Sequence, residues 1–240
     1  MTDKVIFQRQ GWCPICECDV TFSATKTWYR DHLFCSKCGS IPRERALMRV
    51  LAEYYPGYRE LDVHESSPGG RGVSLKLHHQ CARYTGSHFY PDVSPGQYHK
   101  SGYRCENLEK LTFPTNAFDL FITQDVMEHI FDPAQAFREI ARVLRPGGAH
   151  IFTVPIVRKT QASFRKAERR ADGSVVLHGE AEYHGNPIDD SGSLVTMHWG
   201  YDIGAFIAKE AGMPTVIREI TDVDQGIVAE YIDVVVSTKV

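Results

Sequence analysis

Residues 106–148 constrain the fold of this chain most, because they hold the signals for a strand, a helix and a sharp turn in close succession. Residues 118–123 (FDLFIT) form a short apolar run, which is typical of a buried parallel strand. Asp132 and Pro133 then suit the first positions of a helix, the aspartate as N-cap and the proline where no N–H is needed. Apolar residues recur at helical spacing as far as Leu144, so the pattern predicts an amphipathic helix.

The motif that follows this helix predicts a turn and a second strand. Pro146-Gly147-Gly148 cannot continue a helix, and residues 150–156 (HIFTVPI) are again an apolar run. Strand, helix, turn and strand in this order indicate a crossover in an open parallel sheet. Ligands of such sheets bind beyond the carboxyl ends of the strands. We therefore expect Gln124, Asp125 and residues 154–156 to face a binding site.

Three fragments in this region carry a family resemblance. FP-x-x-x-FD at 113–119, V-x-EH-x-x-DP at 126–133 and R-V-L-R-PGG at 142–148 follow one another in order. Together they resemble the class I S-adenosylmethionine (SAM) methyltransferases, in the subgroup called type 11. The resemblance implies an α/β fold with a Rossmann-like doubly wound sheet and an antiparallel last strand. It also implies methyl transfer from SAM.

Four cysteines near the amino terminus have metal-ligand spacing. Cys13, Cys16, Cys35 and Cys38 form the pattern C-x2-C-x18-C-x2-C, which is typical of a zinc ribbon. We predict a ribbon over residues 1–40 whose bound Zn²⁺ supplies much of its folding free energy. Cys18 is a weaker competing ligand, and two pairs of free or redox thiols are the alternative interpretation.

A helix should connect this ribbon to the main domain. Residues 41–56 begin with an early proline and carry an apolar stripe, which predicts a helix, and residues 57–240 would then form the methyltransferase domain. C-x-x-C-G-S-x-P-R-E-R-A-L, at 35–47, resembles the opening of methyltransferases in which a cysteine-rich module precedes the catalytic domain. Arg43 and Arg45 are interpreted as solvated helix charges rather than as partners of a ligand carboxylate.

The expected SAM loop departs from the glycine-rich pattern of the family. The first strand is predicted at residues 59–64, with Asp62 in the acidic position, while His64, Ser66 and Pro68 stand where glycines are usual. A second strand is predicted at 84–89. The resemblance implies that SAM lies over the loop after the first strand and reaches a ribose contact, an adenine contact and the end of the third predicted strand. The residues so assigned are His64, Glu65, Ser66, Ser67, Gly69, His88, Asn107, Leu108 and Gln124.

Residues 157–200 form an insertion that should cap the substrate side of the fold. Its first part, 158–173, is basic and helix-prone, and we interpret it as a solvated helix face rather than as an RNA-binding surface. Histidine suits proton removal near neutral pH, so His184 and His198 are the candidate catalytic bases. The spacing of His178 and His184 does not by itself complete a metal site. The candidate substrate-binding residues are Asp125, His129, Tyr183, Asn186, Trp199 and Tyr201.

Composition and charge narrow the class of partner. The chain has 240 residues and a formal net charge of −3, so it has no overall attraction to nucleic acid or to an anionic membrane. No apolar run approaches the length of a membrane span, and the amino terminus lacks a signal-peptide core. Seven cysteines, four of them with metal-ligand spacing, favour a reducing, cytoplasmic setting.

The expected function is methyl transfer to a small polar acceptor, such as a sugar or a secondary metabolite. No N/D-P-P-Y/F/W motif follows residues 118–123, which counts against the enzymes that methylate amino groups of nucleic acids. The alternatives are an rRNA or tRNA base methyltransferase, and a non-catalytic zinc-containing binding protein on a degenerate methyltransferase fold. The oligomeric state is left open.

Overall fold

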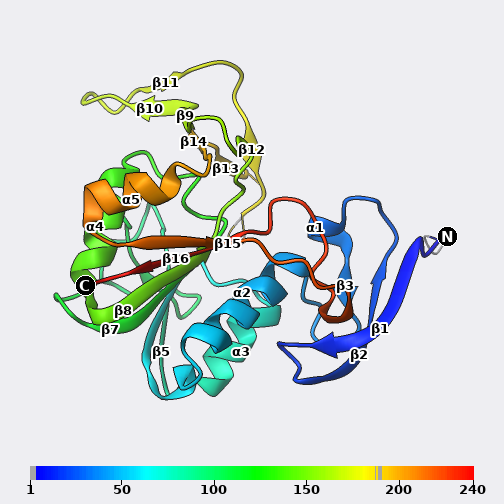
Figure 1. Cartoon of the computed structure of the whole chain (residues 1–240). Helices are drawn as coiled ribbons and strands as arrows, with labels where there is room; N and C mark the ends of the chain where they lie inside the picture. Colours follow the sequence, from blue (N-terminus) through cyan, green and yellow to red (C-terminus); the bar gives the residue numbers. More distant parts are fainter. Residues whose placement is uncertain (1–3, 187, 189–190) are drawn as a thin grey trace.

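A seven-stranded sheet forms the centre of the computed structural model, which describes residues 4–186, 188 and 191–240 (Figure 1). The strand order is β15-β16-β8-β7-β4-β5-β6. Strands β4 to β8 pair in parallel, and β16 is antiparallel to both of its neighbours. This confirms the predicted Rossmann-like, mostly parallel sheet with an antiparallel last strand. The strands are β4 (Asp62–Ser66), β5 (Arg83–His88), β6 (Arg104–Cys105), β7 (Phe118–Gln124), β8 (Leu144–Thr153), β15 (Thr215–Arg218) and β16 (Val234–Thr238).

The predicted crossover is present between β7 and β8. Helix α4 (Pro133–Val143) joins the two parallel strands, and the Asp132 side chain accepts a hydrogen bond from the Gln135 backbone N–H at 3.0 Å. The helix ends at Val143, and β8 starts at once and runs through the Pro-Gly-Gly motif. Gly148 fits because a side-chain Cβ there would lie 2.6 Å from the Asp119 carbonyl oxygen. The second strand therefore begins six residues earlier than predicted.

The first sheet strand begins later than the sequence indicated. Residues Tyr58–Glu60 form a 3₁₀ turn (η1), so β4 spans Asp62–Ser66 rather than 59–64. Asp62 lies at its amino end and pairs with Arg83 and Arg145, at 2.9 and 2.7 Å. The acidic residue near the carboxyl end is Glu65. The assignment of Asp62 to the acidic position of the SAM loop is therefore wrong.

The end of the chain departs from a simple hairpin. Strands β15 and β16 pair antiparallel, and β15 lies at one edge of the sheet. A non-strand excursion, residues 219–233, joins them and contains the 3₁₀ turn η2 (Val223–Gln225). This excursion reaches the N-terminal module, where Arg9 contacts Asp224 and Arg30 Nε donates to the Tyr231 carbonyl oxygen.

The N-terminal module is a small sheet packed onto a helix of the main domain. It contains β1 (Phe7–Cys13), β2 (Cys18–Ala24), α1 (Tyr29–His32) and β3 (Phe34–Cys35), and α2 (Pro42–Tyr54) follows it. Phe22 and Leu33 belong to the same buried cluster as Leu47 and Val63, so one continuous core joins the module to the sheet. Helix α3 (Gly72–Gln80) packs beside α2, and its Val73 and Leu77 join that cluster.

The two arginines at the start of α2 are not solvated, and this interpretation is wrong. Arg45 is fully buried and donates to the backbone oxygens of Leu33, Ser40 and Gly226. Arg43, whose side chain is 17% exposed, contacts Asp31 and Asp125. Both side chains hold parts of the chain together that are distant in sequence, which helical periodicity alone does not reveal.

The insertion after β8 is made of short strand pairs instead of a basic helix. Its elements are β9 (Phe164–Arg165), β10 (Ala167–Arg169), β11 (Val175–Leu177), β12 (Tyr183–His184), β13 (Ser193–Leu194) and β14 (Met197–His198). They lie over the end of the sheet, as Figure 1 shows in yellow and green. Helix α5 (Ile203–Ala211) follows the insertion. No helix within the described ranges is long and apolar enough to cross a membrane.

Two histidines buried in the sheet should make the protein acid-sensitive. His64 and His150 are fully buried. The Nε2 atom of His64 hydrogen-bonds to the Ser87 hydroxyl, and that of His150 to the Thr123 hydroxyl. Neither Nδ1 atom has a hydrogen-bond partner among the described residues. Burial lowers the pKa of both to about 3. In the unfolded chain the two histidines bind protons below about pH 6.5, whereas in the folded protein they stay neutral down to about pH 3. The free energy of unfolding is therefore highest above pH 6.5 and falls as the pH decreases toward 3.

We expect each of these histidines to add about 1.4 kcal/mol per pH unit to the acid dependence of the unfolding free energy over this window. Urea unfolding between pH 7 and 4 measures it. His150→Gln keeps a polar group for Thr123 but cannot titrate, so it should flatten the profile. His178→Gln, at a half-exposed position, is the matched control. An unchanged slope in His150→Gln would contradict the prediction.

Candidate active site

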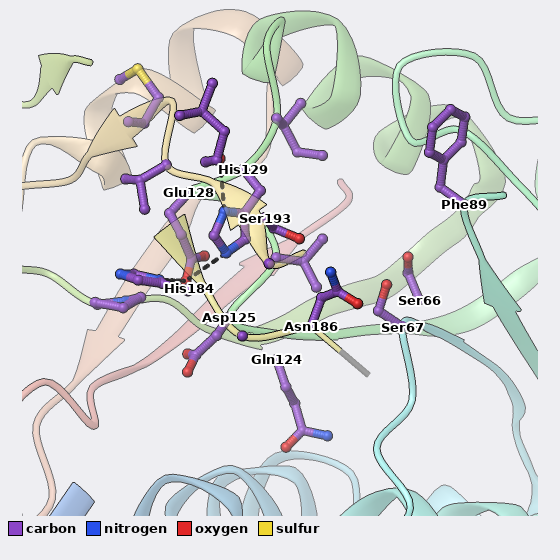
Figure 2. Close-up of a pocket in the computed structure, with 18 of the residues that line it drawn as sticks. Ser66, Ser67, Phe89, Gln124, Asp125, Glu128, His129, His184, Asn186 and Ser193 are labelled. Carbon is purple, nitrogen blue, oxygen red and sulfur yellow. Dashed lines mark hydrogen bonds and ion pairs between the residues drawn. The ribbon is translucent and has the colours of Figure 1, made fainter. Parts of the chain in front are cut away.

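A cavity of about 1230 Å³ lies beyond the carboxyl ends of the parallel strands (Figure 2). Three parts of the chain line it: the loops after β4, β5, β6 and β7, the N-terminal module, and the insertion. The predicted residues that line it are Ser66, Ser67, Gly69, Asn107, Leu108, Gln124, Asp125, His129, His184, Asn186 and His198. The predicted residues thus belong to the loops at the end of the sheet and to the insertion, and none of them comes from the N-terminal module.

The loop after β4 turns sharply at the sheet edge. Ser67 has a positive φ of 58°, a conformation that L-residues rarely adopt and that glycine adopts easily. The Gly69 N–H donates to Ser74 Oγ at 3.0 Å, which ties the loop to the start of α3. Behind the loop, buried Glu65 accepts hydrogen bonds from Ser74 and Gln124. Glu65 thus supports the cavity wall without lining it.

The next two loops add an aromatic ring and an amide. Phe89, directly after β5, is 52% exposed and lines the cavity. Asn107 lines it as well, and its Oδ1 accepts a hydrogen bond from the Glu109 N–H at 2.9 Å. The sequence analysis assigned His88, the residue before Phe89, to this wall. Successive side chains of an extended chain point to opposite sides, so Phe89 lines the cavity and the neighbouring His88 does not.

The N-terminal module forms the second wall through an ion-pair network. Asp125, which follows β7 with φ 51°, contacts Arg30 at 2.7 Å and Arg43 at 2.8 Å. Burial alone would raise the pKa of this carboxyl group, but the charges of Arg43 and Arg30 outweigh it and lower the pKa to about 2. Thr153 Oγ1 donates to the second carboxylate oxygen. Asp125 is therefore an ionised link between the module and the sheet.

The insertion forms the third wall, which is rich in imidazole and carboxylate groups. Glu128 lies 3.7 Å from His129 Nε2 and 3.7 Å from His184 Nδ1, and Figure 2 shows the three side chains directed toward one another. Glu182 contacts His184 at 3.4 Å and His198 at 2.8 Å. Glu128, followed by Glu182, raises the pKa of His184 above its usual value.

Glu128 and His129 are neighbours in the sequence, and neighbouring residues on a helix would not face each other. They lie instead in the turn before α4, and the His129 N–H bonds to the Val126 carbonyl oxygen. The turn brings both side chains to one wall of the cavity. The approach of His184 comes from a segment more than fifty residues later, which local pattern could not indicate.

Several predicted site residues lie away from the cavity lining. His64 packs against Phe113, Phe118 and Phe121 beneath the sheet end. His88 is 5% exposed, and Trp199 is fully buried and donates a hydrogen bond to the Met127 carbonyl oxygen. Tyr201 hydrogen-bonds to Glu219, and Tyr183 is 61% exposed but does not line the cavity. The structure therefore does not bring these five to the site.

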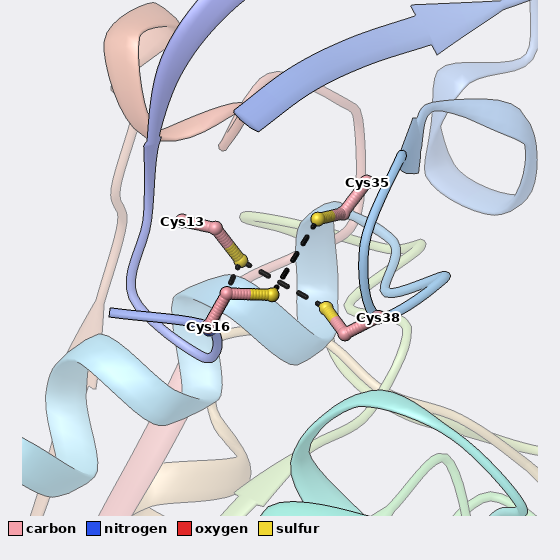
Figure 3. A group of neighbouring side chains, drawn as sticks. All are labelled: Cys13, Cys16, Cys35 and Cys38. Atoms are coloured by element: carbon pink, nitrogen blue, oxygen red, sulfur yellow. Dashed lines mark hydrogen bonds between the residues drawn. The ribbon is translucent and has the colours of Figure 1, made fainter. Parts of the chain in front are cut away.

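The four predicted zinc ligands converge in the N-terminal module (Figure 3). The Sγ atoms of Cys13, Cys16, Cys35 and Cys38 all lie within 4.8 Å of one another. The Cys13–Cys38 distance is 3.9 Å and the Cys16–Cys35 distance is 3.8 Å. Cys18 lies outside this group, and its Sγ contacts Lys37 Nζ at 3.3 Å. Two adjacent turns thus present four thiols to one point.

Comparison with known proteins supports the interpretation of the sheet and its loops. Residues 65–152 match a family model described as a methyltransferase domain. The crystal structure of an S-adenosylmethionine-dependent methyltransferase from Mesorhizobium loti has the same fold. It aligns with a TM-score of 0.52 and 18% identity over 81% of this chain and 97% of that one.

Two curated relatives match shorter segments. An uncharacterized methyltransferase from Schizosaccharomyces pombe is 44% identical over 46 residues, which are 19% of this chain and 16% of that protein. A probable S-adenosylmethionine-dependent methyltransferase from Mycolicibacterium smegmatis is 37% identical over 59 residues, 25% of this chain and 23% of that protein. The chain thus spans less than a quarter of either relative. Residues 65–152 thus match a methyltransferase-domain model, and the chain shares its fold with a solved S-adenosylmethionine-dependent methyltransferase.

Proposed function

We propose that the protein transfers a methyl group from SAM to a small polar acceptor held between the sheet and the insertion. The observation that carries this proposal is the single cavity that runs from the family-matched loops to a wall of histidines and carboxylates. SAM supplies a methyl group that its sulfonium already activates. The protein's task is to align the acceptor with the methyl group, exclude water and take up a proton.

The residues at the sheet edge fit SAM despite the missing glycines. Ser67 adopts the left-handed conformation that glycine usually provides, and a Cβ at Gly70 would meet no atom within 4 Å. Ser66, Ser67 and Gly69 would then hold the methionine end. Phe89 offers an exposed ring face to the adenine base, and Asn107 and Leu108 offer polar groups to its edge. We no longer assign His64 and His88 to SAM binding, because both are buried.

The surroundings of the cavity favour a small acceptor over nucleic acid. The basic residues of the insertion are engaged within the protein: Arg165 donates to the Phe131 carbonyl oxygen, Arg169 lies over the Phe131 ring at 4.1 Å, and Lys166 is 3.5 Å from Glu182. These three side chains are therefore not free to bind phosphate. On the acceptor side, His184 and His198 line the cavity and are the candidates to take a proton.

We also propose that the four-cysteine group binds one structural zinc ion. Zinc–sulfur bonds of about 2.3 Å in a tetrahedron place the sulfur atoms about 3.8 Å apart. The measured separations of 3.8 and 3.9 Å match that value. Such an ion would fix the two turns of a module too small to bury a core of its own, consistent with a stabilising rather than catalytic role.

Replacement of Asn107 by leucine should weaken SAM binding about 5- to 150-fold. The substitution removes a polar group from the adenine wall, and an unpaired buried group costs about 1–3 kcal/mol. Isothermal titration with SAM measures the effect. Asn107→Asp is the matched control, because it keeps the Oδ1 acceptor for the Glu109 N–H and so preserves the turn. Unchanged SAM affinity in Asn107→Leu removes this residue from the site, and no SAM binding by the wild type contradicts the proposed function.

A further inference from the structure

Glu128 is a buried carboxylate whose charge the protein leaves largely uncompensated. Its side chain is 2% exposed, and neither carboxylate oxygen accepts a hydrogen bond from the residues that the structure describes. Burying an ionised carboxylate without partners is costly, so such groups are normally paired or bind a metal ion. Glu128 lines the cavity, and the two nearest basic groups are the imidazoles of His129 and His184.

Hydrogen bonding orients His129 with a lone pair toward this carboxylate. His129 Nδ1 lies 2.9 Å from the Leu194 backbone oxygen. A carbonyl oxygen only accepts, so Nδ1 carries a proton, and in the neutral imidazole Nε2 then has the lone pair. That nitrogen faces Glu128 Oε1 at 3.7 Å. Two hydrogen-bond acceptors that face each other without a proton between them do not stabilise the structure, but both can bind the same cation.

His184 repeats this arrangement from the insertion. Its Nε2 lies 3.4 Å from Glu182 Oε1, and its Nδ1 points toward Glu128 at 3.7 Å. Metal-binding histidines typically donate their other ring N–H to a carboxylate or a backbone carbonyl, which orients the ring and fixes the tautomer. Both kinds of support are present here, one on each imidazole.

We propose that Glu128, His129 and His184 bind one divalent transition-metal cation at the insertion wall of the cavity. The three ligand atoms lie within 4.8 Å of one another, and bonds of about 2.0–2.2 Å would bring them slightly closer around an ion. Two imidazoles and one carboxylate suit zinc, iron(II), cobalt(II) or manganese(II). The side of the group that faces the cavity stays open for water or for an oxygen of the acceptor.

An ion pair between protonated His184 and Glu128 is the competing description. It neutralises the carboxylate, but it uses only one of the two imidazole nitrogens that lie 3.7 Å from Glu128. A cation uses all three groups. With His184 as a ligand, His198 remains the imidazole available for the acceptor's proton. This proposal goes beyond the proposed methyl transfer, because cation binding requires neither SAM nor an acceptor.

Calorimetric titration of Zn²⁺ into protein whose four-cysteine site is already filled tests the proposal. The wild type should bind one additional equivalent of zinc, and Glu128→Gln and His129→Ala should each weaken that binding at least about 100-fold. His178→Ala removes an imidazole from the same insertion but outside the group, so it should bind like the wild type. Thermal unfolding and retained ribbon zinc check that each variant is folded.

Two results overturn the proposal. One is a folded wild-type protein that binds none of Zn²⁺, Co²⁺ and Mn²⁺ more tightly than about 1 mM. The other is a folded Glu128→Gln or His129→Ala variant with wild-type affinity, which places the extra ion elsewhere. Because the titration contains no SAM, neither result depends on the methyltransferase activity, and loss of SAM binding alone leaves this proposal intact.

Discussion

Cys13→Ser is expected to lose the zinc ion and with it the folded N-terminal module. Structural zinc sites of this kind contribute about 10–16 kcal/mol of apparent binding free energy, which is more than the net stability of an ordinary domain. Cys13 is fully buried at the contact between the module and α2, so its replacement also exposes the shared core. Metal analysis should find less than one equivalent of zinc, and the protein should aggregate.

The damage should extend to the cavity. Trp28, Arg30 and Asp31 come from the module and line the cavity, and Arg30 contacts Asp125 at the end of β7. Once the module unfolds, the buried carboxylate of Asp125 loses one of its two arginines. We therefore expect SAM affinity to fall in the same variant, although no cysteine touches the proposed SAM site.

Cys18→Ser is the matched control for this experiment. It makes the same chemical change in the same module, but the Cys18 Sγ lies outside the four-thiol group. Zinc content and thermal stability should stay close to those of the wild type. A full equivalent of zinc in both Cys13→Ser and Cys38→Ser would refute the ribbon.

The parts of the fold that the sequence predicted are those with local signals. The crossover from β7 to β8 follows from an apolar run in each strand and a proline at the start of α4, whereas Pro-Gly-Gly lies within β8 and not at a turn. Each of these acts on its neighbours within a few residues. The four-cysteine group was likewise predictable, because the ligand spacing is itself the signal.

The parts that could not be predicted depend on contacts between distant segments. Residues 158–173 have helical propensity, yet residues 164–165 and 167–169 within them pair as strands, and Arg165 hydrogen-bonds to the backbone of Phe131. Tertiary contacts override weak propensities in this way. The meeting of Glu128 with His184 also spans more than fifty residues, so no spacing rule applies to it.

Strand register explains the errors at the SAM loop. The 3₁₀ turn at Tyr58–Glu60 delays β4, which moves the loop and makes Glu65 the acidic residue at the sheet edge. The observed end of β4, Ser66, lies two residues beyond the predicted end at residue 64. His64 therefore lies inside the strand, where it packs against Phe113, Phe118 and Phe121, and not in the loop.

Arg45→Met should destabilise the protein by about 3–5 kcal/mol, because it leaves buried carbonyl groups without donors. The guanidinium donates to the backbone oxygens of Leu33, Ser40 and Gly226, which belong to the module, the start of α2 and the excursion before β16. The Ser40 oxygen keeps the Cys35 N–H as a donor at 2.9 Å, so the Leu33 and Gly226 oxygens are the ones left unpaired. Each unpaired oxygen costs about 1–3 kcal/mol, and the burial of the methionine side chain offsets part of the sum. Burial lowers the pKa of Arg45 to about 10, so the group is still charged near pH 7.

Urea unfolding of Arg45→Met and of a matched variant, Arg49→Met, measures this contribution. Arg49 lies one turn further along α2 and pairs with Asp222 of the same excursion, but its side chain is 37% exposed. Its loss should cost less than about 1 kcal/mol, as is usual for solvent-exposed ion pairs. Equal effects of the two substitutions would mean that charge on α2, and not the buried hydrogen bonds of Arg45, holds the excursion to the module. A larger loss of stability in Arg45→Met than in Arg49→Met would show that the Arg45 side chain holds the module, α2 and the excursion together.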